Sequence, residues 1–82
     1  MGTSEVKVAF ATAVWFEAHM MHICLVDGRE SRQVGIPLEW FPKLRAATEA
    51  QRKKWRLIGK GIGIHWEELD EDISIAGLLE GR

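Results

Sequence analysis

The feature that most constrains this chain is the dipeptide Asp27-Gly28, which separates two runs rich in apolar residues. Aspartate followed by glycine tolerates the positive φ angles of a two-residue type I′ turn. The flanking runs, residues 20–26 and 29–37, are therefore predicted to be the two strands of an antiparallel hairpin. With this loop, Val26 pairs with Arg29.

The register of the hairpin predicts which side chains face the core. Paired residues share one face of a sheet, and successive residues alternate between its two faces. The predicted core face carries Met21, Ile23, Leu25, Val34 and Ile36. His22 and Cys24 then lie on the opposite face.

A further strand is predicted before the hairpin, over residues 6–16, which are rich in Val, Phe and Trp. A turn near residues 17–19 joins it to the hairpin. One face of this strand is predicted to carry Val8, Phe10, Val14 and Phe16.

Short helical segments are predicted after the hairpin. Apolar residues at 38, 41 and 44 have the spacing of an amphipathic helix or turn, interrupted at Pro42. Thr48 and Gln51 are spaced as a capping box, which predicts a helix over residues 49–55. Ser74 can cap a last helical turn.

Residues 55–59 and 63–66 are predicted to be short extended pieces on either side of a glycine-permitted bend. The whole pattern indicates an α+β fold, with a small antiparallel sheet (a three-stranded meander plus the short extended pieces) packed with one or two short helices. A chain of 82 residues suits a single domain, residues 1–82.

Composition narrows the class of protein. Apolar residues make up 46% of the chain and charged residues 28%, as in globular rather than disordered proteins. The single Cys24 excludes an internal disulfide and suits a reducing compartment, and no apolar run reaches the ~18 residues of a membrane span. We expect a cytoplasmic protein that does not enter a membrane.

The segment 59–74 contains residue types found in phosphate and metal sites, without their spacing. Lys60 is followed by glycine rather than by the Ser or Thr of a phosphate-binding loop. His22 and Cys24 supply only half of a metal site, and no orienting group is evident that would make Cys24 a nucleophile. No metal, cofactor or catalytic residue is therefore expected.

One possible catalytic site is kept as an alternative to this expectation. The five acids between Glu67 and Asp72 are expected in a solvated loop that faces the basic helix. His65 with Asp70 or Asp72 in this segment is a candidate functional loop, in which the histidine and a carboxylate would act as acid and base.

Two further sets of side chains suit binding. A basic set beside the predicted helix is a candidate for nucleic-acid contact, although the net charge is only −1. It consists of Arg52, Lys53, Lys54 and Arg56. The chain also has more tryptophans than so small a core easily covers, and these are candidates for contact with another protein or with a second copy in a homodimer. They are Trp15, Trp40, Trp55 and Trp66.

Four strings of the sequence, in order, are DGRE, IPLEWFPKL, ATEAQRKKWRLIGKGIGIHW and ELDEDISIAGLLEG. They resemble the bacterial domain of unknown function 2442 family over about residues 10–81. The resemblance implies a small α+β domain with an antiparallel sheet and supplies no activity, cofactor or catalytic residue. It also implies a regulatory setting, because members of the family occur fused to helix-turn-helix domains and beside genes suspected to form toxin-antitoxin pairs.

The expected function is therefore a non-enzymatic module that binds another protein, with a regulatory role such as that of a partner in a toxin-antitoxin system. The alternative is a transcriptional regulator that contacts nucleic acid through its basic helix. A third reading is a small enzyme built around His65 and the acidic loop.

Overall fold

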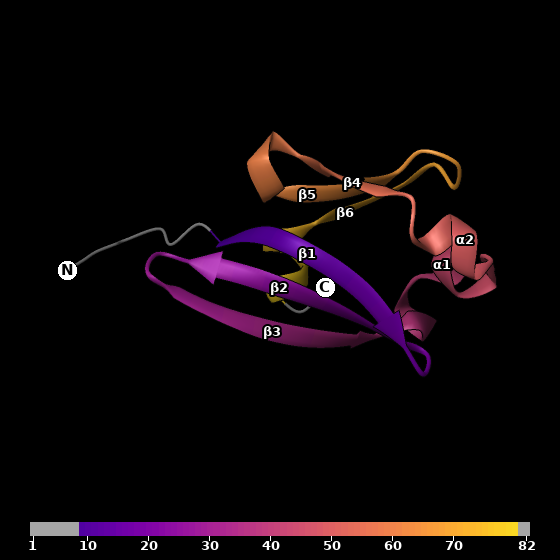
Figure 1. Ribbon diagram of the computed structural model, residues 1–82, viewed down its shortest axis with the longest axis horizontal. Coiled ribbons are helices and arrows are strands. Elements are labelled where there is room, and N and C mark those ends of the chain that lie inside the picture. Colours follow the sequence, from indigo (N-terminus) through magenta and orange to yellow (C-terminus); the bar gives the residue numbers. More distant parts are fainter. Residues whose placement is uncertain (1–8, 81–82) are drawn as a thin grey trace.

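The structure, a computed structural model, describes residues 9–80. Within these residues it has two three-stranded antiparallel sheets and three short α-helices, which confirms the predicted α+β class (Figure 1). The first sheet has the order β1-β2-β3, with bounds Ala9–Glu17, Met20–Asp27 and Glu30–Pro37. The second has the order β4-β5-β6, with bounds Trp55–Ile58, Gly63–Trp66 and Glu71–Ser74.

The β2–β3 hairpin is present as predicted, but its predicted register is wrong by two residues. Asp27 pairs with Glu30, so the loop is Gly28-Arg29. Gly28 has φ of +67° and Arg29 has no positive φ, which is the pattern of a type II′ turn with glycine first. A shift by two keeps every side chain on its predicted face, and the predicted core set is buried apart from the half-buried Val34.

The face predicted for the first strand is wrong in its N-terminal half, because β1 contains a bulge. The pairing with β2 shifts between Ala11 and Ala13, which leaves Thr12 as an extra residue. Ala11 and Val14 are consequently the buried residues, whereas Phe10 lies on the other face. Val8, which was predicted on the same face, lies outside the described residues.

The predicted turn near residues 17–19 joins β1 to β2 as a two-residue loop. Ala18 and His19 have φ of +47° and +67°, and two consecutive positive values define a type I′ turn. Glu17 and Met20 close this turn as a directly paired couple. The type I′ turn therefore sets which pairs of the β1–β2 ladder are hydrogen-bonded between the turn and the bulge at Thr12.

The helical segments are short. The 3-10 helix η1 spans Leu38–Trp40, α1 spans Pro42–Ala46, α2 spans Glu49–Arg52, the 3-10 turn η2 spans Gly59–Gly61 and α3 spans Ile75–Leu79. Both predicted caps are confirmed, Thr48 with Gln51 on α2 and Ser74 on α3. The predicted helix 49–55 ends early, because the chain from Trp55 joins the second sheet as β4. No helix among residues 9–80 is long and apolar enough to cross a membrane.

The second sheet contains the two extended pieces that were predicted and a strand, β6, that was not. Glu71 and Asp72 were expected in a solvated loop, and the structure corrects this by placing both in β6. Ile73 explains the difference, because it is buried opposite Ile64 and draws the segment into the sheet. The loop proper is the turn of residues 67–70.

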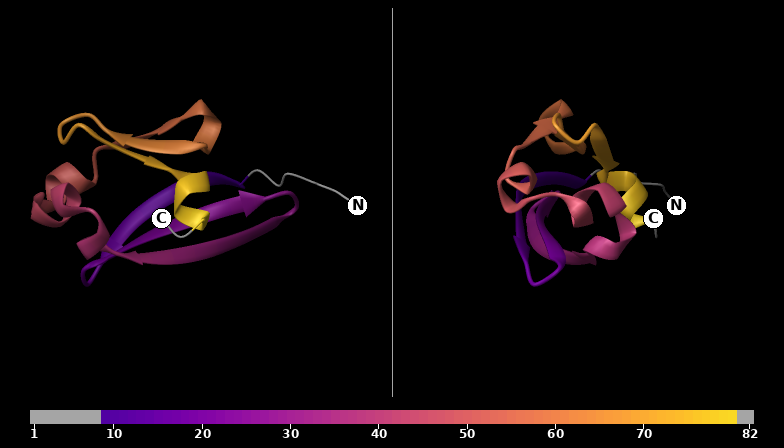
Figure 2. Two further views of the ribbon diagram at one scale, coloured as in Figure 1. Left: turned by 180° about the vertical axis from the view of Figure 1, so that it is seen from behind. Right: turned by 90° about the vertical axis from the view of Figure 1, so that its right-hand side faces the viewer.

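The core lies between the two sheets and beside α1 and α3 (Figure 2). The bend η2 of the second sheet packs directly against the backbone of β1. The approach is so close that a Cβ atom on Gly61 would lie 2.4 Å from the backbone oxygen of Ala11. Gly61 also has φ of +109°, so the bend needs glycine there for two reasons. The amide of Ile75 donates to the carbonyl of Ile62 at 3.0 Å and holds α3 to the same bend.

Candidate functional site

A groove lies between the C-terminal half of β1 and the segment in which α2 leads into β4. It encloses about 360 Å³. Trp15 of β1 and Trp55 of β4 both line it, so the fold brings together two tryptophans that are far apart in the sequence. The charged residues that line it are Glu17, Glu49, Arg52 and Lys53, and residues 14–17 form its β1 side. We call this feature the aromatic groove.

Trp15 is held at the aromatic groove by a neighbour on the next strand. Because of the bulge, Trp15 lies on the outer face of the first sheet, directly opposite His22. The indole and imidazole rings are stacked, with centroids 5.4 Å apart and planes 16° from parallel. Such a cross-strand pair restricts the indole to one orientation at the rim of the groove.

Arg52 forms the opposite wall and ties several elements together. Its Nε donates to the carbonyl of Leu44 and its Nη2 to that of Arg45, both at 2.8 Å, so it closes the C-terminal end of α1. Its guanidinium carbon lies 5.9 Å from the centre of the Phe16 ring on β1. The Arg52 side chain, predicted to contact nucleic acid, is therefore part of the scaffold of the groove.

The four candidate tryptophans do not share one surface. Trp66 is 0% exposed and donates its indole N–H to the carbonyl of Arg52 at 3.0 Å, which corrects its prediction as a partner-binding residue. Trp40 is 42% exposed on η1 and does not line the aromatic groove. Trp15 and Trp55, both half-buried, are the two candidates that the fold brings together.

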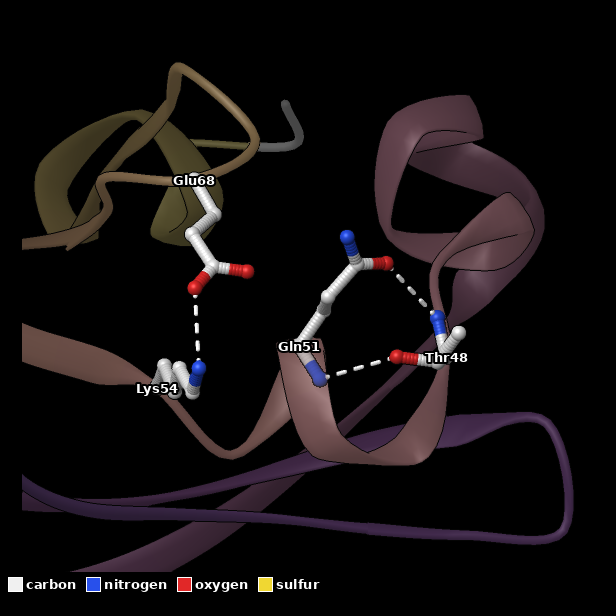
Figure 3. A network of polar contacts seen from close by, with 4 residues as sticks. All are labelled: Thr48, Gln51, Lys54 and Glu68. Carbon is white, nitrogen blue, oxygen red and sulfur yellow. Dashed lines mark hydrogen bonds and ion pairs between the residues drawn. The ribbon is translucent and has the colours of Figure 1, made fainter.

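The rest of the predicted basic set is spread along the chain between α2 and β4, and two of its members face acids. Lys54 Nζ lies 2.9 Å from Glu68 Oε2, beside the capping box of α2 (Figure 3). Arg56 Nη2 lies 3.5 Å from Glu67 Oε1. These pairs confirm that the acidic loop faces the basic segment, and they partly neutralise it. Lys53 is exposed at the aromatic groove.

The candidate loop residues occupy two places. His65 and Asp72 are directly paired across β5 and β6, and Nδ1 of His65 contacts Oδ1 of Asp72. Asp70 is part of the tight turn, with φ of +53°, and its backbone carbonyl accepts from Lys43 Nζ at 3.0 Å. The structure therefore brings together one imidazole and one carboxylate, with Arg56 opposite His65 on the other side.

Cys24 and His22 lie on the outer face of the first sheet, as predicted, and His22 is engaged in the stack with Trp15. In the part of the chain that the structure describes, no three His, Cys, Asp or Glu side chains are grouped so as to hold a metal ion.

The aromatic groove itself was not predicted. The tryptophan content pointed to an exposed aromatic surface, but which two residues meet depends on the packing of β4 against β1. The sequence does contain one indication of this arrangement, the small polar Thr12 within an otherwise apolar strand. Thr12 is the extra residue of the bulge, and an extra residue exchanges the two faces of the strand beyond it.

Comparison with known proteins gives one match. A sequence model of the family described as "Protein of unknown function (DUF2442)" matches residues 11–82. This confirms the family resemblance. No curated protein and no solved structure matches the chain.

Proposed function

The chain belongs to the DUF2442 family of proteins of unknown function, and we propose that it is a non-enzymatic module that binds another protein through the aromatic groove. The observation that carries the proposal is the meeting of Trp15 and Trp55 in one groove. Tryptophan is enriched among the residues that dominate binding energy in protein interfaces. A volume of about 360 Å³ also lies within the range of pockets that hold side chains or small ligands.

The setting of Trp15 supports this proposal. A tryptophan on the outer face of a small sheet contributes little to the core, yet this one is oriented by a stacked histidine. An oriented aromatic side chain loses little conformational entropy on binding, which favours its use as an anchor. A regulatory role, as a partner in a two-gene toxin-antitoxin system, is the form of the proposal that the family resemblance implies.

Nucleic-acid binding has weaker support. Arg52 is bonded to backbone carbonyls, and Lys54 and Arg56 face Glu68 and Glu67. A phosphate backbone would have to compete with these partners, and a net charge of −1 supplies no long-range attraction.

Catalysis at His65 and Asp72 is the second candidate, because their side chains are in contact across β5 and β6. A carboxylate that orients an imidazole is a common part of acid–base sites. The test is a screen of the purified chain against ester, phosphate and glycoside substrates, with His65→Asn as the control. Turnover that survives this substitution would remove His65 from consideration.

The main proposal is tested by capturing a partner with the wild-type chain and then measuring whether substituted chains still capture it. The purified chain is cross-linked in a lysate of its source, and captured proteins are identified by mass spectrometry. We expect Trp15→Ala to abolish capture and Trp40→Ala, which alters an indole outside the groove, to preserve it.

Light scattering on the same samples separates the remaining outcomes. A homodimer that captures nothing would assign the tryptophans to self-association. Capture that is equal in the wild type and the Trp15→Ala variant would reject the aromatic groove as the binding surface.

A further inference from the structure

The hydrogen-bonding pattern of β1 leaves part of its backbone facing outward. The two-residue turn makes Glu17 and Met20 a hydrogen-bonded pair, and such pairs alternate with non-hydrogen-bonded pairs along an antiparallel ladder. Phe16 opposite Met21 and Val14 opposite Ile23 therefore belong to the non-hydrogen-bonded class. Their N–H and C=O groups point away from β2, toward the edge of the sheet.

The same pattern applies at the other end of β1, and there the edge is covered. Ala11 is opposite Leu25, and its N–H and C=O also point outward. The bend η2 lies against these atoms, since a Cβ on Gly61 would fall 2.4 Å from the oxygen and 2.9 Å from the nitrogen of Ala11. The N-terminal half of the β1 edge is thereby closed to any further strand.

The C-terminal half of this edge pairs with no further strand among the residues that the structure describes. Val14 and Phe16 line the aromatic groove, and within residues 9–80 no hydrogen bond from outside the β1–β2 ladder reaches their backbone groups. An edge with unpaired N–H and C=O groups is a template for another strand. Here the template belongs to residues that line a groove together with Trp15 and Trp55.

We propose that the aromatic groove binds an extended segment of a partner polypeptide, which adds as a fourth strand to the first sheet at Val14–Phe16. This inference rests on the proposed function and specifies the partner. The segment's backbone pairs with the outward N–H and C=O groups of Val14 and Phe16. Its alternate side chains lie against Trp15 on the outer face and against Trp55 on the other.

The walls of the groove favour a single extended segment over the edge of a second folded copy. Trp55, Glu49 and Arg52 lie across the groove from β1, so the space beside the edge is confined rather than open. A second copy would have to bring its own β2 and its own α2 into the same space. A single extended segment brings no adjoining strand or helix with it and therefore fits the confined space.

The charges of the groove specify the segment further. Glu17 and Glu49 are balanced by Arg52 and Lys53, because the guanidinium of Arg52 keeps its charge when it donates to neutral carbonyls. A lining without net charge does not favour a strongly charged segment, and the two indoles favour apolar or aromatic side chains. The segment is therefore extended, apolar at alternate positions and without a large net charge.

The opposite edge of the first sheet lacks these features. Ser31, Gln33 and Gly35 of β3 also have outward backbone groups by the same alternation. They are flanked by the exposed charges of Glu30 and Arg32, a common means of blocking strand addition.

The test uses peptides selected on the protein itself. A phage-displayed library of random heptapeptides is selected on the immobilised wild-type chain and counter-selected on the Trp15→Ala variant. The best peptide is synthesised in three forms: unmodified, N-methylated at its odd-numbered amides, and N-methylated at its even-numbered amides. Only one of the two methylated sets would face β1 in an added strand.

We expect one methylated set to weaken binding about tenfold or more and the other to change it less than about threefold, because hydrogen bonds are lost on one edge only. We also expect the backbone amide protons of Val14 and Phe16 to become protected from exchange when the unmodified peptide binds.

Equal effects of both methylated sets, or protection elsewhere only, would overturn strand addition while leaving the groove as a binding site. Failure to enrich any peptide over the Trp15→Ala variant would overturn the strand-addition proposal. Capture of a folded partner in the cross-linking experiment is independent of this result and would still support the proposed function.

Discussion

Replacing Arg52 with alanine is expected to destabilise the protein strongly, although the residue is only half-buried. Its guanidinium closes the C-terminal end of α1 through two hydrogen bonds of 2.8 Å, to the carbonyls of Leu44 and Arg45. The same group lies 5.9 Å from the centre of the Phe16 ring. Alanine removes all three interactions at once.

The expected loss is about 3.5 kcal/mol. Hydrogen bonds from a charged donor contribute roughly 1.5 to 3 kcal/mol each, and the lower value suits a partly exposed side chain. The cation–π contact adds about 0.5 kcal/mol. For a domain of this size each kcal/mol lowers the midpoint of thermal unfolding by roughly 4 to 8 °C, so the midpoint should fall by about 14 to 28 °C.

Thermal unfolding followed by circular dichroism checks this prediction with two controls. Lys53→Ala changes the exposed neighbour and should alter the free energy of unfolding by less than about 0.5 kcal/mol. Arg52→Lys keeps the charge but cannot reach both carbonyls with one ammonium group, so it should lose about half as much as alanine. An Arg52→Ala variant no less stable than Lys53→Ala would refute the role of Arg52 as the connection between α1 and β1.

Three further substitutions, one of them with a matched control, test other parts of the fold by the same unfolding assay. Gly61→Ala should cost about 3 kcal/mol or more, because the new Cβ would lie 2.4 Å from a backbone oxygen and φ is +109°. The control Gly77→Ala, whose Cβ would have its nearest neighbour at 3.6 Å, should be neutral or stabilising by up to about 1 kcal/mol. Trp66→Phe should cost about 2 kcal/mol, since the partly buried carbonyl of Arg52 loses its donor and a cavity forms. Lys54→Ala should cost less than about 1 kcal/mol, because its pair with Glu68 is exposed, and a larger loss would contradict the assignment of that pair to the surface.

The first sheet was largely predictable because its signals are local. The Asp27-Gly28 dipeptide identified the hairpin, and a register error of two residues did not change the faces. The error arose because aspartate was placed inside the loop, whereas Asp27 pairs with Glu30 and glycine takes the first loop position. An error of one residue would have exchanged core and surface along both strands.

The second sheet and the groove were less predictable because they depend on contacts between distant segments. In β6 the charges of Glu71 and Asp72 dominate the local pattern, and the buried Ile73 shows its role only when β5 is beside it. The capping box correctly located the start of α2, but the pairing of Trp55 with Trp66 determines where that helix ends. Tertiary pairing here overrides local propensity.

The bulge at Thr12 connects the fold to the aromatic groove. In an uninterrupted ladder from Ala11, whose side chain is buried, residues 13 and 15 would also face the core. The extra residue reverses this alternation, so that Val14 and Phe16 face the core and Trp15 faces outward beside His22. One small residue thus places an indole at the rim of the groove.

The bulge also determines which backbone groups lie at the edge. The outward N–H and C=O groups of Ala11 are covered by Gly61, and the next outward groups belong to Val14 rather than to residue 13. The open stretch of edge therefore begins one residue farther from the bend, where the chain between α2 and β4 provides the second wall. An unpaired edge is normally a liability that small sheets block with charge or with a covering loop. This fold covers one half of β1 with η2 and leaves the other half in a groove lined by Trp15 and Trp55, an arrangement that the proposed strand addition by a partner would explain.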